Sequence, residues 1–158
     1  MKPGYFLALA ALAGALSAAG PSLADDGCAG KPDAGAAKLT VQNVGMHNGK
    51  GQVAVTVFPD DARRFLAHHG KLLRQRPAAV LPMTSACFWL PPGTYAVAVY
   101  HDENANQDFD RTKLGMPAEG FGFSNDAPTR FGLPSFDAVR FSLPASGRTI
   151  KVRMRYGR

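Results

Sequence analysis

The segment that most constrains the fold is residues 94–100, an apolar run that follows the turn Pro91-Pro92-Gly93. Successive side chains of a strand point to opposite faces, so one face carries Tyr95, Val97 and Val99 and the other carries Ala96, Ala98 and Tyr100. A strand that is apolar on both faces has to be covered on both. We therefore expect a β-domain with this strand at the centre of a sheet.

Shorter alternating segments precede and follow this strand. Residues 38–44 and 53–58 predict two strands, and Asn48-Gly49 between them predicts a hairpin turn. Residues 78–90, 139–143 and 149–156 predict further strands, and the last has a basic outer face. Residues 59–70 predict a short helix, because acidic residues follow Pro59 and Gly70 ends the pattern. Short strands, one brief helix and Pro/Gly turns predict a single all-β domain, a β-sandwich.

The N-terminus has the pattern of an export signal. Lys2 precedes an apolar run at residues 5–19, and small residues at Ser22 and Ala24 suit a signal peptidase. The alternative, a membrane anchor, requires a longer apolar run. We expect a signal peptide at residues 1–24, cleaved near Ala24, a flexible leader at 25–37 and the β-sandwich domain at 38–158. The mature protein is then periplasmic or secreted and has no transmembrane segment.

Two cysteines and a basic charge balance refine this prediction. An even cysteine count in an oxidising compartment favours a disulfide between Cys28 and Cys87, with two separate thiols as the alternative. The formal net charge is +6. An exported chain is not expected to meet nucleic acid, so the partner that this charge suggests is an anionic envelope surface or polysaccharide. The alternative is a solvated face without a partner.

An acidic loop follows the central strand and is the strongest candidate for a metal site. Oxygen-bearing side chains recur at every second position, as Asp102, Asn104, Asn106, Asp108 and Asp110. Ca²⁺ takes carboxylate and amide ligands at such spacing in EF-hand loops. Gln107 stands where those loops need Gly, and Lys113 stands where they close with Glu, although Glu119 offers a carboxylate further along. The alternative is a loop ordered by Asx-turns without metal.

Aromatic residues follow the acidic loop. Phe121 and Phe123 alternate with glycines, and Phe131 lies nearby. These rings are candidates for a sugar- or peptide-binding surface. The alternative is that they cover the open end of the sandwich.

Three motifs in order, at residues 91–104, 115–125 and 134–138, resemble an exported bacterial family known as domain of unknown function 2141. The resemblance covers roughly residues 38–157. It implies a secreted or periplasmic β-sandwich and no established activity. The Pro91-Pro92-Gly93 turn with its strand is also similar to transthyretin-like and collagen-adhesin B-type modules, and a sandwich of this kind can be immunoglobulin-like. That likeness concerns the fold only.

No nucleophile motif or phosphate-binding glycine loop is recognisable in the sequence. The sequence therefore predicts a non-enzymatic binding or scaffold domain of the envelope, with no catalytic residues and no cofactor other than Ca²⁺ at the acidic loop. Two alternatives remain open. One is a metal-assisted hydrolase acting from residues 101–119, where His101 adjoins Asp102. The other is a carbohydrate- or peptide-binding module that uses the loop aromatics.

Overall fold

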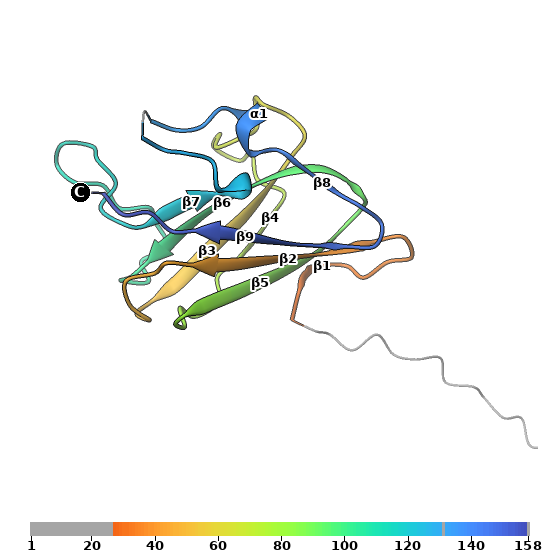
Figure 1. Ribbon diagram of the computed structural model, residues 1–158, viewed down its shortest axis with the longest axis horizontal. Coiled ribbons are helices and arrows are strands. Elements are labelled where there is room, and N and C mark those ends of the chain that lie inside the picture. The colour runs from red at the N-terminus through yellow and green to blue at the C-terminus, as the bar shows by residue number, and fades with distance from the viewer. Residues whose placement is uncertain (1–26, 131, 158) are drawn as a thin grey trace, which may run out of the picture.

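The computed structural model describes residues 27–130 and 132–157, and the predicted signal peptide lies outside them. Two β-sheets pack face to face, which confirms the β-sandwich (Figure 1). Sheet A has the order β1 (Ala29–Gly30), β5 (Met83–Leu90), β2 (Ala37–Val44) and β9 (Arg148–Arg153). Sheet B has the order β4 (Leu73–Gln75), β3 (Gln52–Pro59), β6 (Gly93–Asp102) and β7 (Phe121–Phe123), with β8 (Phe141–Leu143) also paired to β6.

The core between the sheets is built by the alternation along the strands. Valines of β3 and β6 face Leu39 and Val41 of β2, Phe88 of β5 and Val152 of β9, and these four residues have no exposed surface. Strand β6 is central, as predicted, because β3 pairs with one edge while β7 and β8 pair with the other. The sandwich is therefore held mainly by burial of aliphatic surface.

The outer face of sheet B is covered at one end. A short 3-10 turn, η1 (Ser124–Asp126), and the helix α1 (Phe136–Val139) lie over it (Figure 1). The hydroxyl of Ser124 accepts the backbone N–H of Val97 at 2.9 Å and donates to the carbonyl of Val139 at 2.5 Å. This contact fixes the cover on β6. A second apolar cluster lies beneath it, formed by Phe58, Ala96, Phe123, Ala127 and Val139.

Two predicted local elements are wrong. Strands β2 and β3 do not form a hairpin, because they belong to different sheets and residues 45–51 cross between the layers. Their inner faces are both apolar and share the same core, which favours stacking over pairing. The helix predicted at 59–70 is a series of turns, with Leu66 and His69 in the left-handed region at φ 57° and 62°. Phe65 packs edge-to-face on Phe58 at 5.4 Å, so these turns follow tertiary packing.

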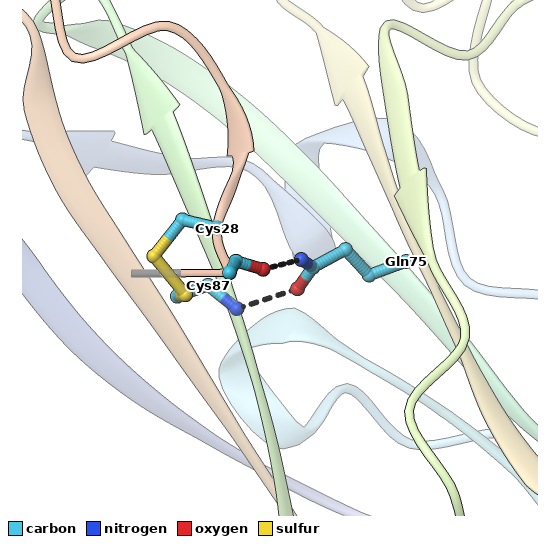
Figure 2. Close-up of a disulfide and its surroundings, with 4 residues drawn as sticks. Cys28, Gln75 and Cys87 are labelled. Carbon is cyan, nitrogen blue, oxygen red and sulfur yellow. Dashed lines mark hydrogen bonds between the residues drawn. A yellow bond between two sulfur atoms is a disulfide. The ribbon is translucent and has the colours of Figure 1, made fainter. Parts of the chain in front are cut away.

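The predicted disulfide between Cys28 and Cys87 is present. Its first cysteine precedes β1, which pairs in parallel with β5, so part of the predicted flexible leader belongs to sheet A. Figure 2 shows how Gln75 of sheet B supports this bridge. The Gln75 amide donates to the Gly27 carbonyl at 2.6 Å and accepts the Cys87 N–H at 2.8 Å. Within the described residues, no helix has the length and apolarity needed to span a bilayer.

Candidate functional site

The acidic loop begins at the end of β6 and is organised by Asp102. This side chain is fully buried. Its Oδ1 accepts the N–H of Asn106 at 3.1 Å, and its Oδ2 accepts the N–H of Gln107 at 2.9 Å and the amide of Gln52 at 2.7 Å. The guanidinium of Arg76 lies 3.9 Å away and balances the charge. Asp102 therefore pins the loop to the end of sheet B.

The exposed part of the loop is held by a second set of hydrogen bonds. The Oδ1 of Asn104 accepts the N–H of Asn106 at 3.0 Å, and the Oδ1 of Asn106 accepts the N–H of Asp108 at 2.9 Å. The amide nitrogens of both asparagines donate to the Asp110 carboxylate, at 2.7 and 3.0 Å. Gln107, where EF-hand loops have Gly, still adopts the left-handed backbone at φ 67°.

Glu119 closes the loop from its far end and is the most unusual group in it. The residue is 5% exposed, and its Oε2 accepts the N–H of Asp110 at 3.1 Å. Its Oε1 is buried and has no hydrogen-bond partner. Burial raises the pKa of Glu119 and the negative charges of Asp110 and Asp102 raise it further, while the backbone N–H groups of Asp110 and Glu103 partly offset this by lowering it. The structure thus places a carboxylate against the loop in surroundings that disfavour its charge.

All six predicted metal ligands lie in this one loop, but as a hydrogen-bonded cluster. They are Asp102, Asn104, Asn106, Asp108, Asp110 and Glu119. Asp108 is exposed, and its carboxylate accepts the N–H of Phe109 at 2.8 Å. Over the part of the chain that the structure describes, no three His, Cys, Asp or Glu side chains are grouped so as to hold a metal ion.

His101 points into the end of the sandwich. Its Nε2 lies 2.8 Å from the carbonyl of Lys50, which only accepts, so Nε2 carries the proton. In the neutral ring, Nδ1 then accepts the hydroxyl of Tyr156 at 2.7 Å. Burial raises the pKa of Tyr156. Because His101 and Asp102 bond to different partners, they do not form an acid/base pair.

A groove of about 480 Å³ opens on the uncovered part of the outer face of sheet B. Thr56, Ala98 and Tyr100 of β3 and β6 contribute to its lining. Three aromatic residues, Phe109, Phe121 and Phe123, line it as well. Of the predicted surface aromatics, Phe121 is half-buried and borders this groove, whereas Phe123 is only 3% exposed and belongs to the second apolar cluster. Phe131 lies outside the described residues.

The aromatic rings connect the groove to the acidic loop. Phe109 belongs to the loop and packs edge-to-face on Tyr100 at 5.4 Å and on Phe121 at 5.8 Å. Arg76 donates to the Tyr100 hydroxyl at 2.9 Å and to the Gln107 carbonyl at 3.0 Å. The conformation of the loop thus determines where one aromatic wall of the groove lies.

The groove lining is basic. Its nitrogen-bearing ionisable side chains are those of His68, His69, Lys71, Arg74 and Arg111, and no Asp or Glu is among the described residues that line it. Within the described residues, no ion pair joins Lys71, Arg74 or Arg111 to a carboxylate. Arg74 donates to the Thr56 hydroxyl at 2.7 Å, and burial lowers its pKa. Sequence reasoning missed this grouping, although residues 71–76 stand out as a basic segment.

Comparison with known proteins gives a family and no activity. The model of a bacterial family described as "uncharacterized protein conserved in bacteria", DUF2141, matches residues 40–151. No curated protein and no solved structure matches the chain. The matched residues extend from within β2 to within β9 and include both the acidic loop and the residues that line the groove. The chain therefore belongs to the bacterial family DUF2141.

Proposed function

We propose that this protein is an exported, non-enzymatic binding domain that holds an acidic oligosaccharide in the groove on sheet B. The observation that carries the proposal is the groove lining, whose described residues include aromatic rings and five His, Lys or Arg side chains but no carboxylate. A disulfide of this kind is typical of exported proteins, which supports a place in the periplasm or outside the cell.

The size and chemistry of the groove suit this ligand class. Its volume of about 480 Å³ falls within the range of small-ligand sites, roughly 300–1,000 Å³. The C–H faces of sugar rings are apolar and pack well on aromatic side chains such as Phe109 and Phe121. Carboxylate or sulfate groups of an acidic sugar attract Lys71, Arg74 and Arg111, whose charges have no acidic partner in the described structure.

The geometry of the loop favours binding over hydrolysis. A general base must reach the proton that it abstracts. Both ring nitrogens of His101 are hydrogen-bonded, and the ring is fully buried. The carboxylate of Asp102 already accepts three hydrogen bonds. Neither residue is therefore well disposed to act on a ligand in the groove.

Calorimetric titration tests the proposal with two oligosaccharides of equal length, one of uronic acids and one neutral. We expect the acidic sugar to bind and the neutral sugar to bind at least tenfold more weakly. Arg111→Ala and Lys71→Ala remove exposed cations of the groove, and each should weaken binding about tenfold, because a charge-assisted hydrogen bond contributes about 1.5 kcal/mol or more.

Lys151→Ala is the matched control, because Lys151 is an exposed cation on β9 of the other sheet. It should leave the affinity unchanged. Equal affinities for the acidic and neutral sugars, or equal losses from Lys151→Ala and Arg111→Ala, would contradict the groove as the binding site. Undetectable binding of the acidic sugar would contradict the proposed ligand class.

A further inference from the structure

One oxygen of the buried Glu119 carboxylate has no hydrogen-bond partner. Its Oε1 is one of two buried side-chain polar atoms without a hydrogen-bond partner in the described part of the chain. Leaving such an atom unpaired costs free energy, and native structures seldom do so without a compensating ligand, ion or water. The free Oε1 of Glu119 can therefore interact with a bound ion or ligand.

The surroundings of Glu119 indicate whether the bound species is positively or negatively charged. Its other oxygen accepts the Asp110 N–H at 3.1 Å, so the carboxylate lies against the inner side of the acidic loop. The carboxylates of Asp110 and Asp102 are its acidic neighbours. The guanidinium of Arg76 lies 3.9 Å from Asp102, but it also donates to Tyr100 and Gln107. A cation is the species that relieves both the unpaired oxygen and the gathered negative charge.

We propose that the loop binds one Ca²⁺ ion, with the buried Glu119 carboxylate as the ligand that completes the site. The other ligands are Oδ1 of Asp102, the Asp110 carboxylate, and the amide oxygens of Asn104 and Asn106. Ca²⁺ accepts six to eight oxygens in a flexible shell that can include amides and water, so it does not need three converging acidic side chains. Mg²⁺ demands a tighter octahedron and suits a mixed loop of this kind less well.

One local change accommodates the ion. The amide nitrogens of Asn104 and Asn106 now donate to Asp110, at 2.7 and 3.0 Å. A cation at Asp110 replaces these two donors, and rotation of each exposed amide brings its oxygen to the ion. The bonds from Asp102 to the backbone of Asn106 and Gln107 can stay in place, since each carboxylate oxygen has more than one acceptor position.

The experiment is a calorimetric titration of the chelator-treated protein with CaCl₂, together with thermal melting at each calcium concentration. We expect one saturable site, and a melting temperature that rises with free calcium because the folded state binds the ion. A dissociation constant at or below about 1 mM suits an extracellular module. Glu119→Gln keeps the side-chain shape and an acceptor for the Asp110 N–H, and should weaken calcium binding at least tenfold.

Asp126→Asn is the control, because Asp126 pairs with Arg155 at 3.0 Å outside the loop. It should bind calcium as the unsubstituted protein does. Three results would overturn the proposal: no saturable binding up to about 10 mM calcium, which exceeds the weakest extracellular sites tenfold; unchanged affinity in Glu119→Gln; or equal binding of Mg²⁺. Sugar binding is measured in a separate titration, so a negative result for the calcium site does not contradict the sugar-binding groove, and the reverse also holds.

Discussion

Gly51 lies where the connection between the sheets passes beside the start of the acidic loop. Its φ is +66°, and a Cβ atom built there would lie 2.0 Å from the carbonyl oxygen of Asp102. Both the backbone conformation and the space therefore require glycine at this position. The sequence suggests turn chemistry here, but the close approach depends on where β6 ends.

Gly51→Ala should lower the free energy of unfolding by about 3 kcal/mol or more, because strain and a backbone clash act together. Gly115→Ala is the matched control, since Gly115 also has a positive φ, 78°, but nothing lies within 4 Å of its Cβ position. That variant should cost only about 1–2 kcal/mol. Urea unfolding measures both, and equal losses would show that the contact with Asp102 does not matter.

At the scale of the element, the acidic loop depends on one buried side chain. Asp102→Asn replaces an acceptor-only group by one that must present an N–H to existing donors. We expect a loss of about 2–3 kcal/mol in unfolding free energy and faster hydrogen exchange at the amides of Asn106 and Gln107. The measurement is made with chelator present, so that loss of bound calcium does not contribute to the difference.

Asp108→Asn provides the comparison for this prediction. Asp108 is exposed, and its carboxylate accepts the N–H of the neighbouring Phe109. The substitution should change stability by no more than about 0.5 kcal/mol, as surface changes usually do. If it matched Asp102→Asn in stability and exchange, the buried carboxylate would not be the organising group.

The elements that sequence reasoning predicts well are those with a strong local signal. Strand β6 shows its period and its two apolar faces directly, and β9 shows its basic outer face. The predicted hairpin of β2 and β3 is wrong: Asn48-Gly49 suits a tight turn, but the shared core decides which strands stack. The turns around Phe65 depend on rings from β3 and β7, which no local pattern contains.

The candidate site divides in the same way. Five oxygen-bearing side chains are evident from residues 102–110, since they are neighbours in the chain. The groove is not evident from the sequence, because its cations are far apart in the chain. Lys71 precedes β4, Arg74 lies in β4, and Arg111 lies in the loop after β6. Only the pairing of β4 with β3, and of β3 with β6, brings these cations to one face.

At the scale of the whole molecule, the disulfide joins the first strand to the body of the fold. The Cys28–Cys87 bridge spans 59 residues. The chain-entropy model gives about 4 kcal/mol of stabilisation for a loop of that length. A Cys28→Ser, Cys87→Ser double variant should therefore melt well below the oxidised protein. The double variant should have the same melting temperature as the reduced, unsubstituted protein. If the oxidised protein, the reduced protein and the double variant all melted at one temperature, the bridge would add no stability.

The two-residue strand β1 affects how readily copies of the protein associate with one another. It pairs with Phe88 and Trp89 of β5 and so occupies part of that strand's backbone edge. An open strand edge is a template for pairing with another copy of the chain. Loss of the bridge would free β1 and uncover this edge, so reduced protein should self-associate more readily. The intact disulfide would then limit self-association as well as stabilise the fold, so the solubility of the protein would depend on the redox state of its surroundings.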